Sequence, residues 1–346
     1  MPDMMPKTVK ATLPEGLDDF LNEAGWAGAE VEPLPGDASF RRYFRVRNGG
    51  FSAIMMDSPP PQEDPRPFLH VGRWLSEKGL RAPLIYAERA ERGLVLLEDF
   101  GNDRMRDWLD LHPAEEPAVY ARAIAALVAL HAHPPGPFEP YDLATYQREA
   151  ALFVEWYCPG MSLAVDEAGW HDAWDAVLTP MLARQQPGVT VLRDYHAENI
   201  MLLGGPAANG NGGPAASAGE QGLIDFQDAL VGHRAYDLVS LLQDARRDVS
   251  PALEQAMLEL YCTSTDPGPD FLADYARLGA QRNAKIVGIF ARLWRRDGKP
   301  RYLALIPRVW EALERDLAHP ALAPVAAWFV ANMPQELRER RGGEVE

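Results

Sequence analysis

The hydrophobic pattern of the chain changes near residue 100, and this change constrains the fold more than any other feature of the sequence. Before it, aromatic and β-branched side chains gather in short runs. Two such runs, at 39–47 and 51–57, flank an Asn-Gly-Gly sequence at 48–50 that is typical of a hairpin turn. The other elements predicted for this part are a second hairpin, at 84–89 and 94–98, and helices at 17–26 and 68–78. We therefore expect residues 1–100 to form a small, β-rich lobe.

Beyond residue 100 the pattern becomes mainly helical. The helices predicted from apolar residues at helical spacing cover 117–133, 143–157 and 170–184. A β-like stretch at 189–226 interrupts the helical patterns, which then continue to the end of the chain. Residues 101–346 should form a larger, helical lobe, so the predicted fold class is α+β with two lobes.

Composition and charge narrow the classes of function. Hydrophobic residues make up 47% of the 346 residues, which is enough for two packed lobes. The net charge of −16, from 34 Lys and Arg against 50 Asp and Glu, repels nucleic acid and anionic lipid, so neither is an expected partner. The two cysteines form no Cys-x-x-Cys pair, which argues against a zinc site.

Targeting signals are also absent from the sequence. No signal-peptide core occurs near the first residue, and no apolar stretch approaches the ~20 residues that span a bilayer. We expect a cytoplasmic monomer without a membrane partner. The segment 204–222 is rich in Gly, Ala and Asn, and we expect it to form a flexible hairpin tip.

The residues that indicate a chemistry lie in the stretch 189–237. An apolar run leads into Arg193 and Asp194, Asn199 follows five residues after Asp194, and another apolar run ends at Asp225. Phosphoryl transfer needs a carboxylate to accept the proton of the attacking hydroxyl, and oxygen ligands to hold Mg²⁺ against the phosphates. Order and spacing therefore favour Asp194 as catalytic base, with Asn199 and Asp225 as Mg²⁺ ligands.

Two nearby residues have more than one interpretation. Asp237 begins a helical pattern, and it either caps that helix or braces the catalytic loop, of which we favour the second. His196 can bind substrate, orient the loop or pack within it. The triplet Asp-Phe-Gly at 99–101 resembles a kinase metal-binding motif, but it precedes the catalytic loop, so we interpret it as the crossing between lobes.

Several of these segments resemble known kinases. The sequences LRDYHAEN at 192–199, LIDFQD at 223–228 and GHRAYDL at 232–238 are similar to the aminoglycoside phosphotransferase and choline kinase superfamily. The sequences PGDASFRRYFRV at 35–46 and QRNAKIVGIFARLWRRDGKPRYL at 281–303 more closely resemble bacterial kinases of cell-wall amino sugars. Members of that group phosphorylate the anomeric hydroxyl of N-acetylmuramate and N-acetylglucosamine in peptidoglycan recycling.

The resemblance implies a protein-kinase-like fold, ATP and Mg²⁺ as cofactors, and a small sugar as substrate. It implies ATP contacts from a phosphate-covering turn, its flanking arginines and the backbone of a hinge: Gly36, Ser39, Phe40, Arg41, Arg42, Leu97 and Glu98. The candidates for sugar contacts are His196, Asp228, Arg282, Asn283 and Lys285, and the alternative for the charged residues among them is a solvated helix face.

The sequence departs from the kinase pattern at one position. The predicted strand 51–57 has no lysine, and Met55 or Met56 stands where a phosphate-holding lysine is expected. Either Arg41 or Arg42 replaces it, or ATP binds more weakly. Two alternatives therefore remain: a kinase for aminoglycosides or another small hydroxyl compound, and a pseudokinase that binds nucleotide without catalysis. The complete set of Asp194, Asn199 and Asp225 argues against the pseudokinase.

Overall fold

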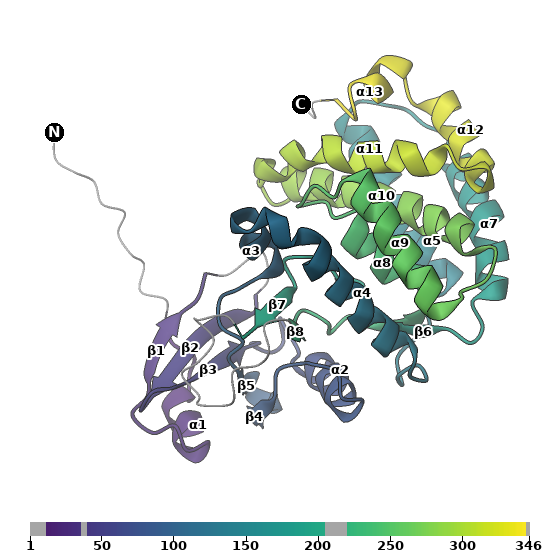
Figure 1. Cartoon of the computed structure of the whole chain (residues 1–346). Coiled ribbons are helices and arrows are strands. Elements are labelled where there is room, and N and C mark those ends of the chain that lie inside the picture. The colour runs from purple at the N-terminus through teal and green to yellow at the C-terminus, as the bar shows by residue number, and fades with distance from the viewer. Residues whose placement is uncertain (1–11, 36–39, 205–219, 344–346) are drawn as a thin grey trace. The chain divides into compact units, whose positions relative to one another are not determined.

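The structure is a computed structural model, and it describes residues 12–35, 40–204 and 220–343 (Figure 1). By the packing of its Cα atoms the chain divides into two compact units. The first unit comprises Met1–Asp103 and Met201–Gln227, and the second comprises Arg104–Ile200 and Asp228–Glu346. The division that we predicted at residue 100 leaves 201–227 in the second lobe, whereas the packing of this segment assigns it to the first unit.

An antiparallel sheet of five strands, in the order β1-β2-β3-β5-β4, forms the body of the first unit. Its strands are β1 (Glu30–Pro33), β2 (Arg42–Asn48), β3 (Phe51–Asp57), β4 (Ile85–Arg89) and β5 (Leu94–Glu98). Both predicted hairpins are confirmed. Gly49 and Gly50 have φ angles of 56° and 90° in the β2–β3 turn, the positive values that such a two-residue turn requires.

One face of this sheet is covered by the first helix. Alternation along the strands places Phe44, Val46 and Met55 on the same face, where they pack against Leu17 and Phe20 of α1 (Leu17–Glu23). A second helix, α2 (Arg66–Glu77), follows the proline-rich segment after β3. Both helices that the sequence predicts in this part are therefore present.

A separate hairpin completes the first unit. β7 (Ile200–Leu203) pairs with β8 (Glu220–Leu223), and Met201 and Leu203 pack with Phe100 and Ile224. This small apolar cluster explains why 201–227 belongs to the first unit. Of the tip that we predicted to be flexible, residues 205–219 lie outside the described part of the chain.

The second unit is helical around one long helix (Figure 1). Its main helices are α3 (Met105–Leu111), α4 (Glu116–His131), α5 (Leu143–Leu152), α7 (Glu167–Arg184), α8 (Ala235–Leu242), α9 (Pro251–Thr265), α10 (Phe271–Arg295), α11 (Ile306–Leu317) and α12 (Ala323–Asn332). Most of α10 is buried, and it packs against α5, α8 and α11. Among the described helices, none has both the length and the apolarity needed to cross a membrane.

Short elements lie between these helices. The helix that we predicted at 143–157 is α5 followed by a π-helical turn, Phe153–Tyr157. The strands β6 (Val189–Val191) and β9 (Leu230–Gly232) pair with each other, so the β-like part of the sequence extends a few residues beyond the predicted end at 226.

Candidate active site

A buried carboxylate holds the loop that carries Asp194. Asp237, in the first turn of α8, is fully buried. Its Oδ2 accepts a hydrogen bond from the N–H of Leu192 at 2.7 Å, and its Oδ1 accepts one from the N–H of Arg193 at 2.9 Å. Arg193 has a left-handed φ of 71°, a costly conformation that persists only with such support. The geometry therefore favours the bracing role for Asp237 over helix capping.

A second layer supports the same loop. Ser240 Oγ donates to the carbonyl of Arg193 at 3.2 Å, and Arg282 Nη2 donates to Ser240 Oγ at 2.9 Å. Burial and the nearby Asp194 raise the pKa of Asp237 to about 7, although two backbone donors and Arg282 favour its ionised form. Arg282 was a candidate for sugar contact, but it is buried behind the loop, where it supports Ser240 instead.

Asp194, the predicted base, and Asn199, a predicted metal ligand, share this loop, and both are half-buried. Asn199 Nδ2 donates to the backbone carbonyl of Asp194 at 3.0 Å, which fixes the amide relative to that residue. The N–H of Asp194 donates to the carbonyl of Leu192 at 2.9 Å. A carboxylate and a carboxamide oxygen on one held loop suit proton acceptance and Mg²⁺ coordination, respectively.

His196 packs within the loop. Its side chain is 5% exposed, and its Nε2 lies 3.4 Å from both Asn199 Nδ2 and Arg246 Nη1. Burial, followed by the charges of Arg246 and Arg282, lowers the pKa of His196 well below its usual range. The structure thus favours loop packing over sugar contact for this residue.

Glu149 on α5 joins two cations beside the loop, and the sequence analysis did not single it out. Its Oε1 accepts a hydrogen bond from Arg193 and pairs with Lys285 Nζ at 2.9 Å, while its Oε2 accepts one from the hydroxyl of Tyr141. Burial alone raises the pKa of Glu149, but Lys285, Arg193 and Tyr141 bring it below its usual value. A single Glu in a helical pattern carries no signal of this role, because its partners are distant in sequence.

The remaining candidates for sugar contact, Asn283, Lys285 and Asp228, differ in how far their side chains are buried. Asn283 is fully buried and donates to Gln243 Oε1 at 2.7 Å, so its position in α10 places it in the helical core and not at a substrate surface. Lys285 is partly exposed and lies beside Arg193, which keeps it as a candidate. Asp228 is exposed, and its backbone carbonyl lies 3.5 Å from Arg193 Nη1.

Asp225 belongs to the first unit. It follows β8 with a positive φ of 59°, its side chain is exposed, and its Oδ1 accepts a hydrogen bond from Gln227 Nε2 at 2.9 Å. The next residue, Phe226, is buried and stacks on Phe68 of α2 with ring centroids 4.9 Å apart. The buried ring anchors the turn, so the carboxylate of Asp225 is held at the surface of this unit.

The predicted phosphate-binding turn is described only in part. Gly36 and Ser39 lie outside the described residues, and Phe40 is 68% exposed. Arg42 is held by its cross-strand partner Asp57, whose Oδ2 accepts from Nε at 2.8 Å and from Nη2 at 2.5 Å. Arg42 is therefore already engaged by a strand carboxylate.

The lysine that is missing from β3 is not replaced within that strand. Met55 and Met56 are both fully buried. Arg41, immediately before β2, instead forms an ion pair with Glu63, with 3.5 Å between Nη2 and Oε2. Arg41, next to the start of the neighbouring strand β2, thus remains a candidate for the replacement cation.

The predicted adenine contacts lie on an inner strand. β5 runs between β3 and β4, and Leu97 has Ile54 and Ile85 as its register partners, so its backbone groups are used in the sheet. The carboxylate of Glu98 accepts two hydrogen bonds from Arg81, at 2.5 and 2.7 Å. Backbone groups for a nucleotide base are therefore to be sought after Glu98, where β5 ends.

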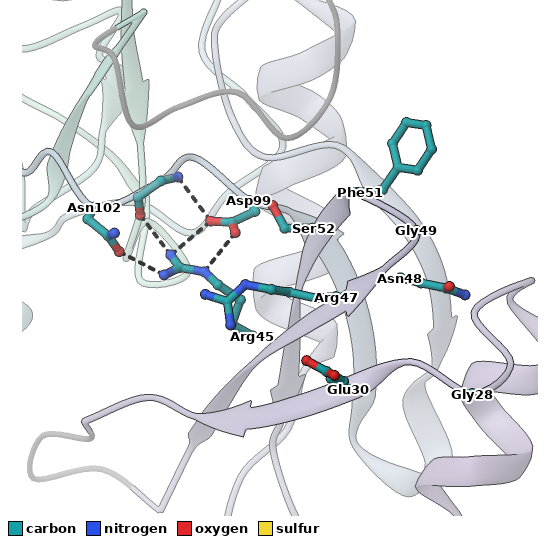
Figure 2. A pocket seen from close by; sticks show the side chains of 12 residues that line it. Gly28, Glu30, Arg45, Arg47, Asn48, Gly49, Phe51, Ser52, Asp99 and Asn102 are labelled. Atoms are coloured by element: carbon teal, nitrogen blue, oxygen red, sulfur yellow. Dashed lines mark hydrogen bonds and ion pairs between the residues drawn. The ribbon is translucent and has the colours of Figure 1, made fainter.

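A polar pocket of about 490 Å³ lies where the chain leaves β5 (Figure 2). Arg45 on β2 reaches this segment: it donates to Asp99 at 2.7 and 3.0 Å, to Asn102 Oδ1 at 2.8 Å and to the carbonyl of Gly101 at 3.0 Å. The Asp-Phe-Gly triplet is thus tied to the sheet, which suits a connecting segment better than a metal site.

Comparison with known proteins assigns the fold and the chemistry of this arrangement. Residues 30–280 match the family model described as "Phosphotransferase enzyme family". An N-acetylmuramate/N-acetylglucosamine kinase from Caulobacter vibrioides is 38% identical, over 92% of this chain and 96% of that protein. A protein of the same name from Pseudomonas aeruginosa is 37% identical, over 92% of this chain and 94% of that protein.

Solved structures share the fold at low identity. An ADP-bound aminoglycoside phosphotransferase has a TM-score of 0.59 at 15% identity, covering 87% of this chain and 97% of the other. A choline kinase from Streptococcus pneumoniae has a TM-score of 0.58 at 12% identity, covering 89% and 99%. These matches confirm the predicted fold class, and the family model and the two kinases named above confirm the predicted resemblance.

Proposed function

The chain belongs to the phosphotransferase enzyme family, and we propose that it transfers a phosphoryl group from ATP to the anomeric hydroxyl of N-acetylmuramate, N-acetylglucosamine or both. The identity to the Caulobacter and Pseudomonas kinases carries this proposal, because it spans nearly the whole of each relative. The reaction would serve peptidoglycan recycling. We place it in the cytoplasm, where ATP is available, and assign it to a monomer.

Each polar residue of the site has a role in this proposal. Asp194 accepts the proton of the attacking hydroxyl. An anomeric hydroxyl is more acidic than other sugar hydroxyls, so this base can accept its proton late in the reaction. Asn199 and Asp225 supply the amide and carboxylate oxygens that Mg²⁺ prefers. When bound, Mg²⁺ offsets the negative charge of the phosphates.

A pseudokinase is the second candidate, and one observation favours it. β3 has no lysine, and its two methionines are fully buried. A nucleotide-binding protein without turnover would tolerate this loss. A kinase for an aminoglycoside or another small hydroxyl compound would share the chemistry proposed above and differ in its substrate.

One set of incubations separates the three candidates. The purified chain is incubated with ATP, Mg²⁺ and, in turn, N-acetylmuramate, N-acetylglucosamine and an aminoglycoside, while ADP release and product mass are followed. We expect turnover with at least one amino sugar and none with the aminoglycoside. If the aminoglycoside alone is phosphorylated, the protein is an aminoglycoside kinase and not an amino-sugar kinase. ATP binding without any product would favour the pseudokinase.

The matched control is Asp194→Asn, which removes the proposed base and keeps the size of the side chain. Turnover should fall by about 10²–10⁴-fold, the usual contribution of general-base catalysis. ATP binding should persist, because Asp194 acts on the sugar hydroxyl.

A further inference from the structure

Arg41 is a buried cation in the first unit. Its side chain is 9% exposed and forms the ion pair with Glu63, whose own side chain is 22% exposed. Arg41 also makes a side-chain hydrogen bond with Tyr43, the second residue of β2. Glu63 lies three residues before α2, so the guanidinium is held by the segment before α2 and by the start of β2.

The charge of Asp225 reaches this cation. Burial lowers the pKa of Arg41, but Tyr43, Glu63 and Asp225 together raise it above its ordinary value, so the guanidinium stays charged. All four residues belong to the first unit. A fixed positive charge close to a proposed Mg²⁺ ligand is the arrangement that anionic phosphates require.

Arg42 differs from Arg41 in its exposure and in its partners. Its side chain is 43% exposed, and its guanidinium is occupied by Asp57 and by the carbonyl of Thr12 at 2.9 Å. Arg42 is the first residue of β2 and pairs with Asp57 on the adjacent strand, whereas Arg41 precedes β2 and pairs with Glu63 in the segment before α2.

We propose that Arg41 is the cation that binds the phosphates of ATP, and that Glu63 and Tyr43 position it in place of the ion pair that a β3 lysine would form. This inference rests on the proposed function, since it assumes that the chain binds ATP. The cation enters from the start of β2 and not from β3, which explains how β3 can carry buried methionines. A guanidinium presents a planar fork that binds two phosphate oxygens at once, where an ammonium acts as a single point charge.

The test compares the affinity of ATP with that of adenosine, by calorimetry, in the presence of Mg²⁺. Adenosine lacks phosphates, so the ratio of the two affinities reports the phosphate contacts alone. In Arg41→Met, ATP affinity should fall by about 10- to 100-fold, as expected for the loss of a charge-assisted contact, while adenosine affinity stays unchanged. Arg41→Lys should recover part of the loss. Arg73→Met is the control, because Arg73 is an exposed cation on α2 that pairs with Glu88.

Glu63→Gln tests the positioning role, and it keeps the inference falsifiable if Arg41→Met does not fold. Its ATP affinity should fall by about 3- to 10-fold, and its effect should not add to that of Arg41→Met, because both changes act on one contact. Unchanged ATP affinity in Arg41→Met, or an equal loss in Arg42→Met, would overturn the inference while leaving the proposed function intact. If the unmodified chain binds ATP no more tightly than adenosine, both the inference and the proposed function fail.

Discussion

Asp237 Oδ1 accepts a hydrogen bond at 2.9 Å from the backbone N–H of Arg193, a residue in the left-handed conformation. The bond links the first turn of α8 to the residue that precedes Asp194. The second oxygen of the same carboxylate accepts a hydrogen bond from the N–H of Leu192, so both carboxylate oxygens of Asp237 hold the loop. The position of the proposed catalytic base therefore depends on a residue that does not itself reach the substrate.

Substitution of Asp237 by Asn should weaken this support. The amide keeps one acceptor oxygen but turns an NH₂ group towards the second backbone donor. We expect the free energy of unfolding to fall by about 1.5–3 kcal/mol, the range for a hydrogen bond to a charged group. Turnover should fall while the KM for ATP changes little. Asp248→Asn, at an exposed carboxylate that pairs with Arg308, should stay within about 0.5 kcal/mol of the unmodified chain.

Removal of Glu149 should leave two cations next to each other. In Glu149→Ala, Arg193 and Lys285 lose their shared carboxylate, and breaking such a pair costs about 3 kcal/mol. Urea unfolding measures this loss. A second change, Lys285→Met, should return part of it by removing one of the two charges. Arg148→Ala, on an exposed position of the same helix, serves as control, and an equal loss there would refute the account of this cluster.

Arg45 and Arg47 form a matched pair on one face of β2. Arg45 forms hydrogen bonds with the segment after β5, whereas Arg47 pairs with Glu32 and is about half exposed. Arg45→Met should cost about 3 kcal/mol, because it leaves the buried carboxylate of Asp99 without its partner. Arg47→Met should cost less than about 1 kcal/mol, the usual value of an exposed ion pair. Similar losses in the two variants would contradict the anchoring role of Arg45.

His131 should make the chain sensitive to acid. Burial, followed by Arg234 and His233, lowers the pKa of His131 to about 3, against 6.5 in an unfolded chain. Between these values the unfolded chain binds a proton that the folded chain does not, so stability is complete above pH 6.5 and is lost as the pH falls. Between pH 7.5 and 5.5, the unmodified chain should lose about 1.4 kcal/mol more than His131→Gln. Equal losses in urea titrations would show that His131 titrates normally.

Local signals in the sequence predicted much of this structure. The Asn-Gly-Gly turn at 48–50 predicted the β2–β3 hairpin, because positive φ angles at two glycines specify such a turn. The order of Asp194, Asn199 and Asp225 predicted a phosphotransferase chemistry, and the motif sequences around them predicted the family by resemblance, which the comparisons confirmed. The sequence favoured the bracing role of Asp237 but did not decide it, because a residue at the start of a helix can either cap that helix or brace a neighbouring loop.

Features that depend on distant contacts could not be predicted. Most of α10 is buried, so its sequence pattern does not distinguish Asn283, which faces the core, from Lys285, which is partly exposed. Glu149 acquires its role only when α5 and α10 pack together. The ion-pair partners of Arg41 and Arg42 could not be predicted either, because Glu63 and Asp57 are distant from them in the sequence.

The most direct test of the central claim concerns the hydroxyl that is phosphorylated. The chain is incubated with ATP, Mg²⁺ and either free N-acetylglucosamine or its methyl glycoside, and the products are identified by phosphorus NMR; N-acetylmuramate and its methyl glycoside form a second pair. The account predicts a sugar 1-phosphate from at least one free sugar and no product from its methyl glycoside, whose anomeric oxygen is blocked. Equal phosphorylation of the methyl glycoside would show that the reaction occurs at another hydroxyl, and the assignment as an anomeric kinase would be wrong.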